Sequence, residues 1–400
     1  MSAGARDAAR PEVLLLGFGA VGALYGFILQ RGGARVTAVC RSNYESVREH
    51  GIDVDSAKFG VHRGWRPDRV IHEPEQLGNT NIDYVVCTVK CVPDLRYNSE
   101  TMRPYLEHSR AARPGRLPAV VLIQNGIDIE EEVYQSLVNV REPLASAVIG
   151  GLSWVGVTLL GEGTRIAHGA MERLCVGLYP MPDIAAPSAE VEASYKAFLC
   201  TLKQGGSDVE GSDDIEAVRW SKVLWNISWG GLSTMSRQPV SVLLRAEMLP
   251  YAVGVVRRLM LELISVARAH GITEARLPIA MVDTTFNFSL SSSPATFVSP
   301  ADPSAQIPRH ITDTLTDDFK PSILVDLERG RPMELEAIFG NLIKRARAYG
   351  VETPRLDLIV AALMPLQMEF IRRATHAPAD GESSVYNPSP SKEATSGTPV

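Results

Sequence analysis

The sequence predicts an α/β fold: a doubly wound parallel sheet in the N-terminal half, followed by an all-helical C-terminal domain. Three observations support this prediction. A glycine-rich turn directly follows an apolar run at residues 13–16. Further apolar runs at 35–40, 82–90 and 119–123 are separated by stretches long enough for crossover connections. From about residue 213 onward, the apolar residues recur at helical spacing.

The bulk composition restricts the class of protein. The 400 residues suggest two or three domains, and we expect one over 11–212 and a second over 213–375. The net charge of −6 argues against a nucleic-acid partner. No apolar run approaches the ~20 residues that a membrane-spanning helix needs. Five cysteines without zinc-type spacing predict reduced, buried thiols and no metal site, which is typical of a cytoplasmic protein.

The N-terminal segment Met1–Arg10 contains charged residues but no apolar stretch, so we do not expect a secretory signal. A short mitochondrial presequence is the alternative, and Asp7 and the shortness of the segment argue against it.

The glycine-rich turn is the first functional candidate. Gly17, Gly19 and Gly22 have the G-x-G-x-x-G spacing and lie between the apolar run and a helical pattern. These glycines permit a tight turn, close approach of a pyrophosphate, and close packing of helix on strand. The helix that follows directs its unsatisfied N–H groups at the phosphates. The alternative is a purely structural turn. We predict a Rossmann-type dinucleotide site formed by Gly17, Phe18, Gly19, Ala20, Val21 and Gly22.

The end of the second predicted strand indicates which dinucleotide binds. A site that prefers NAD usually has an acidic residue here, which accepts hydrogen bonds from the ribose. This chain has Arg41, Ser42 and Asn43 after Cys40. Arg41 would pair with a 2′-phosphate, so the sequence favours NADP (NADPH) as cofactor. The alternative is that Arg41 only makes a surface loop soluble.

Two further polar residues lie at predicted strand ends. Lys90 ends the apolar run 82–90, and Asn125 with Gly126 directly follows the run 119–123. In a doubly wound sheet, ligands bind at the carboxyl ends of the strands. Each residue alone is also explained by an ordinary turn or a solvated strand end. Two of them at one crevice favour a shared ligand.

The rest of the chain is predicted from periodicity. Residues 144–178 are β-rich, with a hairpin turn at 161–163. Residues rich in Ser and Pro over about 286–318 indicate an inserted surface loop, and 376–400 a disordered tail. We expect helices over 189–204, 215–228, 248–270, 273–284, 319–328, 334–349 and 356–373.

Polar residues on the predicted C-terminal helices are the remaining candidates. Lys222 and Asn226 are four residues apart and share one helix face among tryptophans and aliphatic residues. Burial would lower the pKa of the lysine and make it a usable proton donor, whereas the alternative is a side chain that reaches solvent. Ser322 is explained as a helix cap and Glu334 as an acid in a first helical turn, unless both belong to a site.

Together these segments resemble the ketopantoate reductase (2-dehydropantoate 2-reductase) family over residues 13 to about 370. The glycine motif is shared with many dehydrogenases, and the lysine–asparagine pair and the serine-to-glutamate spacing are more specific. The matching residues are Gly17–Gly22, Arg41-Ser42, Val89-Lys90, Gln124-Asn125-Gly126, Lys222-x3-Asn226, Lys320-Pro321-Ser322-Ile323-Leu324-x-Asp326 and Glu334.

The resemblance implies an N-terminal domain that holds NADPH, an all-helical domain that closes the cleft, and reduction of 2-dehydropantoate to pantoate. Lys222 would be the general acid, and Glu334 would orient Lys222 or the substrate hydroxyl. The partner is thus a small 2-oxo acid, and a homodimer through the helical domain is also expected.

The resemblance further implies the binding roles. Lys90 and Asn125 would lie between the nicotinamide and the substrate. Asn226 and Ser322 would hold the polar groups of the substrate, with Ser322 on its carboxylate.

The chain departs from the family pattern in its substrate-binding part. A second asparagine expected one turn after Asn226 is replaced by Gly230, and a further asparagine is absent from 238–240. The alternative function is therefore a reductase of the same architecture for another 2-oxo acid or ketone. A non-catalytic NADP-binding sensor is a third hypothesis, and the presence of both Lys222 and Glu334 argues against it.

Overall fold

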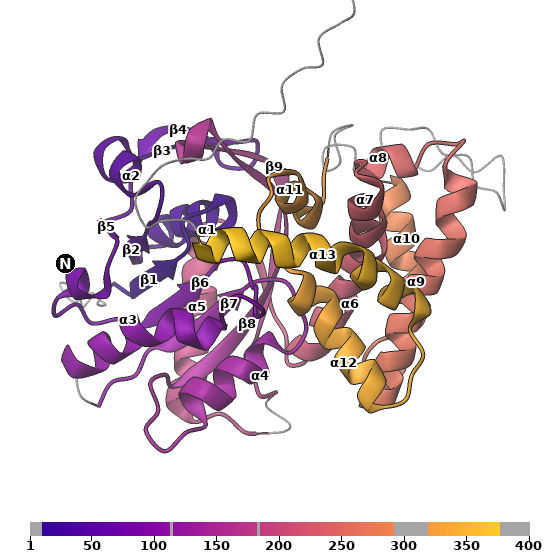
Figure 1. The fold of residues 1–400 in the computed structure, drawn as a ribbon. Helices are drawn as coiled ribbons and strands as arrows, with labels where there is room; N and C mark the ends of the chain where they lie inside the picture. The colour runs from indigo at the N-terminus through magenta and orange to yellow at the C-terminus, as the bar shows by residue number, and fades with distance from the viewer. Residues whose placement is uncertain (1–9, 113–114, 182–184, 292–318, 377–400) are drawn as a thin grey trace, which may run out of the picture.

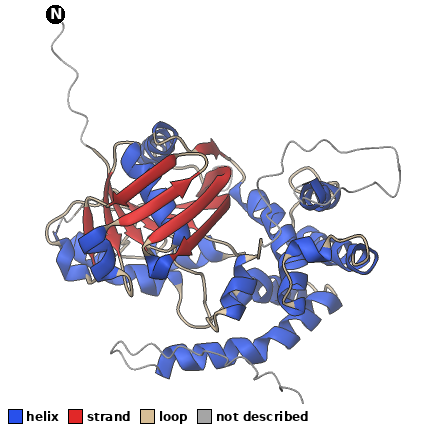
Figure 2. Cartoon of the chain, turned by 90° about the horizontal axis from the view of Figure 1, so that it is seen from above, coloured by secondary structure: helices blue, strands red, loops and turns tan. Residues whose placement is uncertain are grey.

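The computed structural model describes residues 10–112, 115–181, 185–291 and 319–376. A ten-stranded mixed sheet occupies the N-terminal half, and helices make up the C-terminal half. The two halves lie side by side, and Figure 2 shows the sheet with its flanking helices on one side of the molecule and the C-terminal helices on the other.

Five parallel strands form the centre of the sheet, in the order β2-β1-β6-β7-β8. Their carboxyl ends meet at one edge, and the strand order reverses between β1 and β6, where α/β proteins bind ligands. The strand expected over 82–90 ends earlier, at Cys87, because the carbonyl of Val89 accepts from the side chain of Gln124 rather than from a strand. These strands are β1 (Glu12–Leu16), β2 (Arg35–Val39), β6 (Tyr84–Cys87), β7 (Ala119–Ile123) and β8 (Ala147–Leu160).

The remaining strands extend the sheet at both ends. β8 and β9 form the predicted antiparallel hairpin around the short 3-10 turn η3 (Gly161–Gly163). β3 pairs with β9 in parallel and with β4 in antiparallel orientation, and β5 pairs with β2. Their bounds are β3 (Ile52–Ser56), β4 (Gly60–Trp65), β5 (Arg69–Ile71), β9 (Arg165–Tyr179) and β10 (Asp208–Gly211).

Helices cover both faces of the parallel strands. Successive residues of a strand point to opposite faces. Leu15 thus belongs to the core under α1 and α5, and Leu14 to the core under α3 and α4. The bounds are α1 (Ala20–Arg31), α2 (Tyr44–His50), η1 (Pro74–Leu77), α3 (Asn98–Ala112), α4 (Ile129–Val133) with the π-helical turn η2 (Tyr134–Val138), and α5 (Ala189–Gln204).

The C-terminal helices have a hydrophobic core of their own, which includes Trp220, Leu259 and Phe339. α6 continues through a π-helical turn, η4, into α7. The last helix, α13, runs across the front of the molecule towards the sheet (Figure 1). The bounds are α6 (Ile215–Trp225), η4 (Asn226–Gly230), α7 (Gly231–Ser236), α8 (Val240–Leu243), α9 (Leu249–His270), α10 (Met281–Ser291), α11 (Ser322–Glu328), η5 (Glu336–Gly340), α12 (Asn341–Ala348) and α13 (Pro354–His376).

Some predictions need correction. The helix expected over 273–284 instead spans 281–291, because Val282, Phe286 and Leu290 are the residues that pack on the core at helical spacing. The first six residues of the expected loop at 286–318 are therefore helical, whereas 292–318 and the tail 377–400 lie outside the described residues. Cys200 on α5 is exposed, and the other four cysteines are buried as expected. Among the described helices, none has the length and apolar character to cross a membrane.

Candidate active site

A cleft runs between the carboxyl edge of the parallel strands and the helical half. Its volume is about 3670 Å³, well above the ~300–1,000 Å³ of a typical small-ligand pocket. That leaves room for a dinucleotide and a second molecule. Of the residues predicted from sequence, Gly22 and Glu334 lie behind the cleft wall, and those that line it are Gly17, Phe18, Gly19, Ala20, Val21, Arg41, Lys90, Asn125, Lys222, Asn226 and Ser322.

The glycine turn has the geometry that a dinucleotide phosphate requires. Gly17 has φ +93°, and a Cβ there would lie 2.8 Å from Val89. A Cβ on Gly22 would lie 1.9 Å from the carbonyl oxygen of Gly17, so α1 packs directly on the turn. A Cβ on Gly19 would have no atom within 4 Å, and no side chain caps the N-terminus of α1 at Gly19. The backbone at Gly19 is thus open to an anion.

The loop after β2 lies beside this turn. Arg41 and Ser42 are exposed and line the cleft. Asn43 donates from Nδ2 to the carbonyl oxygen of Phe18 at 3.1 Å, which ties the loop to the glycine turn. The positive charge of Arg41 is therefore presented on the same wall as the open N-terminus of α1.

Lys90 bridges the two halves of the molecule. Its Nζ lies 2.6 Å from Oδ2 of Asp326 on α11 and 3.9 Å from Oε2 of Glu334. Burial works to lower the pKa of Lys90, but the two carboxylates outweigh it and raise that pKa above its ordinary value. Lys90 is therefore a positively charged side chain that lines the cleft and is held in place by Asp326.

Glu334 supports the polar residue at the end of β7. It is 3% exposed, and it accepts from the backbone N–H of Cys91 at 3.0 Å and from Nδ2 of Asn125 at 3.3 Å. These bonds orient the amide of Asn125. Within the described residues, Glu334 and Lys222 share no hydrogen bond, and Glu334 acts on Lys222 through its charge.

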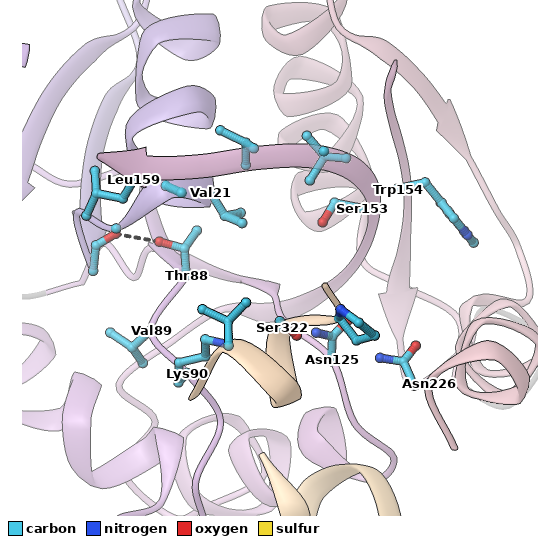
Figure 3. A pocket seen from close by; sticks show the side chains of 18 of the residues that line it. Val21, Thr88, Val89, Lys90, Asn125, Ser153, Trp154, Leu159, Asn226 and Ser322 are labelled. Carbon is cyan, nitrogen blue, oxygen red and sulfur yellow. Dashed lines mark hydrogen bonds between the residues drawn. The ribbon is translucent and has the colours of Figure 1, made fainter. Parts of the chain in front are cut away.

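Lys222 on α6 lines the cleft, and its bonding partner Ser153 and neighbour Trp154 are labelled in Figure 3. Its Nζ donates to the carbonyl oxygen of Ser153 on β8 at 2.5 Å and lies 5.5 Å from the ring centre of Trp154. Burial, followed by the positive charge of Arg219, lowers the pKa of Lys222 to about 7, against the opposing charge of Glu334. This amine exchanges a proton near neutral pH, as a general acid must.

Asn226 and Ser322 complete the site from the helical half. Both line the cleft and are labelled with Asn125 in Figure 3. Within the part of the chain that the structure describes, neither side chain has a hydrogen-bond partner. Ser322 is the first residue of α11 and does not cap it. Both groups are therefore available to a ligand.

Two residues at the site had no role predicted from sequence. Asp326, which was named only within the segment that matches the family pattern, is the partner of Lys90; it is four residues after Ser322 and shares its helix face. Arg219 is buried and donates to the carbonyl oxygens of Gln124 and Gly126 at 3.0 and 2.9 Å. The same helix also carries Glu216 and Lys222, so the charge of Arg219 does not stand out in the sequence.

Comparison with known proteins identifies the family. Residues 13–180 match the family model "Ketopantoate reductase PanE/ApbA", and residues 214–367 match its C-terminal counterpart. The chain belongs to the ketopantoate reductase family. It is 28% identical over 373 residues to an uncharacterized protein of Saccharomyces cerevisiae, covering 90% of this chain and 95% of that protein. It is 24% identical to the 2-dehydropantoate 2-reductase of a Nostoc species, and the match covers 86% of this chain and 92% of that protein.

Solved structures agree with this ketopantoate reductase assignment. The 2-dehydropantoate 2-reductase of Methylococcus capsulatus superposes with a TM-score of 0.68 at 29% identity, over 90% of this chain and 97% of that one. The 2-dehydropantoate 2-reductase of Geobacter metallireducens superposes with a TM-score of 0.69 at 26% identity, over 88% of this chain and 99% of that one. A D-mandelate dehydrogenase solved with NADH and anilino(oxo)acetate shares the fold at 15% identity and a TM-score of 0.65. The family is one of oxidoreductases, and the fold is the expected Rossmann-type domain with a helical partner.

Proposed function

We propose that this protein reduces a 2-oxo acid to the 2-hydroxy acid with NADPH, and that 2-dehydropantoate is the first substrate to test. The single observation that supports this most is Lys222, an amine with a pKa lowered to about 7 that faces the cleft from the helical half. The names of the Nostoc, Methylococcus and Geobacter relatives support the same reaction class.

The cofactor wall fits a phosphorylated dinucleotide. The open backbone at Gly19 and the uncapped N-terminus of α1 would receive the pyrophosphate. Arg41 and Ser42 would hold a 2′-phosphate, since residues 40–43 contain no carboxylate that would repel it. When bound, a reduced nicotinamide dinucleotide supplies the hydride that adds to the carbonyl carbon of the substrate.

Lys222 would deliver the proton. As the carbonyl carbon gains the hydride, negative charge develops on its oxygen, and protonated Nζ of Lys222 donates its proton there. One C=O bond becomes CH–OH, and the lysine is left neutral. The bond to the Ser153 carbonyl holds Nζ in place before and after transfer.

The remaining polar residues would hold the substrate and keep Asn125 in position. Asn226 and Ser322 would bind the oxygens of the substrate, with Ser322 on the substrate carboxylate. The positive charge of Lys90 would balance the charge of that carboxylate across the cleft. Asn125 would contact both nicotinamide and substrate. Glu334 is here a positioning residue, because its hydrogen bonds reach Asn125 and Cys91 rather than the cleft.

The test follows NADPH oxidation by near-ultraviolet absorbance, with 2-dehydropantoate and a panel of other 2-oxo acids, and with NADH in parallel. We expect turnover with NADPH. Lys222→Ala should lower kcat by about 10²–10⁴-fold and leave NADPH binding, measured by fluorescence titration, intact. NADPH binding without oxidation by any 2-oxo acid would contradict the proposal, and a fully active Lys222→Ala variant would contradict the role of Lys222.

A further inference from the structure

One wall of the substrate end of the cleft is aromatic. Trp225 on α6 lies one turn after Lys222 and next to Asn226, and all three residues line the cleft. Its ring meets the ring of Phe319 edge to face, with centroids 6.2 Å apart and an angle of 64° between the planes. Phe319 in turn precedes Ser322 by three residues. The proposed substrate-binding residues Asn226 and Ser322 are thus each close in the chain to one of these two rings, and all four line the cleft.

This aromatic wall is held in a fixed orientation. Nε1 of Trp225 donates to Oγ of Ser289 on α10 at 3.0 Å, so the polar edge of the indole is bonded away and its remaining surface is apolar. Trp154 on β8 lies beside Lys222, with its ring centre 5.5 Å from Nζ. A further aromatic ring, from the sheet half of the molecule, thus lines the cleft next to the proposed proton donor.

The next helical turn adds no polar group. Gly230 lies four residues after Asn226, and a Cβ there would have three neighbours: Cβ of Pro321 and the backbone carbonyl oxygen of Trp225 at 3.9 Å, and Cγ2 of Ile323 at 4.0 Å. Pro321 and Ile323 flank Ser322 in the chain. Gly230 is buried behind the residues that line the cleft, so this position presents no polar side chain to a ligand.

We infer that the substrate is a 2-oxo acid with an aromatic side chain, which packs on Trp225 and Phe319 while Asn226 and Ser322 hold its oxygens. This inference rests on the proposed function and specifies its substrate class. A flat ring gains both apolar burial and edge-to-face contact from this wall. The branched, hydroxyl-bearing side chain of 2-dehydropantoate has no ring for such contact.

The first test compares kcat/KM for phenylpyruvate, benzoylformate and 2-dehydropantoate, all with NADPH. The better aromatic substrate should exceed 2-dehydropantoate by about tenfold or more, the value of a good aromatic contact. A preference for 2-dehydropantoate would overturn this inference and leave the proposed function intact. If none of the three acids supports NADPH oxidation, turnover with an aliphatic 2-oxo acid alone would overturn this inference, and no turnover with any 2-oxo acid would contradict the proposed function.

The second test removes the ring. Trp225→Leu should lower kcat/KM for the aromatic acid by about 5- to 100-fold, mainly through KM, and change that for an aliphatic 2-oxo acid far less. Trp225→Phe should restore most of the loss. Tyr251→Leu is the matched control, because Tyr251 is 77% exposed on α9 and lies outside the cleft. Phe319→Leu repeats the comparison if Trp225→Leu fails to fold, and equal losses with both acids would overturn the inference.

Discussion

At the scale of single residues, the surroundings of Lys222 decide its chemistry more than its type does. A lysine at the surface keeps its proton to a pH near 10, and it is then a poor acid at neutral pH. Here, burial in the cleft brings its pKa to about 7. The helical spacing to Asn226 was visible in the sequence, but the Ser153 carbonyl that receives Nζ was not, because it comes from a strand 69 residues away.

The lowered pKa predicts the pH dependence of the reduction. In the proposed mechanism the protonated amine is the active form, so kcat/KM should be constant below pH 7 and fall as pH rises through about 7. Measurements of kcat/KM from about pH 5.5 to about pH 9.5, a range that includes both protonation states of Lys222, would check this prediction. Lys222→Arg is the control, since arginine keeps its proton throughout and should give a low but flat profile. A wild-type profile without a decline above neutral pH would contradict the assignment.

Arg41 predicts the choice between the two dinucleotides. Arg41→Ala should raise KM for NADPH by about 10- to 100-fold, the equivalent of one charge-assisted hydrogen bond. KM for NADH should barely change, because NADH lacks the 2′-phosphate. Steady-state kinetics with both cofactors would measure this. Equal effects on NADPH and NADH would mean that Arg41 only holds its loop.

At the scale of elements, two glycines of the turn between β1 and α1 are expected to have different roles, one in stability and one in cofactor binding. Gly22→Ala should destabilise the protein and lower Tm, because its Cβ would lie 1.9 Å from the carbonyl oxygen of Gly17. Gly19→Ala should leave Tm nearly unchanged, because nothing lies within 4 Å of that Cβ, and should weaken NADPH binding by obstructing the phosphates. Thermal melts and fluorescence titrations of both variants would test the pair. An unaffected cofactor affinity in Gly19→Ala would contradict the phosphate site.

The elements also show how far sequence reasoning extends. Short buried strands and α5 matched their predicted positions, since their apolar patterns are set by local burial. The start of α10 was misjudged because its apolar residues pack on distant helices, which local spacing does not reveal. The same reason applies within the site. Glu334 was expected to orient Lys222 or the substrate hydroxyl, and the sequence did not reveal its bonds to Cys91 and Asn125 from the other half of the chain.

At the scale of the whole molecule, buried charges join the two halves. Arg219 on α6 pairs with Glu130 on α4, and their side chains are only 3% and 5% exposed. The same guanidinium bonds the carbonyls on either side of Asn125. One side chain therefore fixes α6, and with it Lys222, against the carboxyl end of β7.

Removing this ion pair should be costly. Arg219→Met leaves Glu130 buried without its partner, so the free energy of unfolding should fall by about 3–5 kcal/mol. Arg347→Met is the matched control. It removes an exposed pair with Asp357, for which about 1 kcal/mol or less is expected. Urea titrations would measure both. A similar loss of unfolding free energy in the two variants would mean that the buried pair of Arg219 stabilises the protein no more than an exposed pair does.

Because the two halves have separate cores, substitutions in one half are expected to leave the packing of the other half intact. The groups assigned to the dinucleotide lie mainly on the sheet and its loops, and the wall assigned to the substrate lies mainly on α6 and α11. On the proposed assignments, replacements on those helices would alter which carbonyl compound is accepted and leave the dinucleotide site unchanged. Sequence identity over the whole chain would then be a poor guide to the substrate.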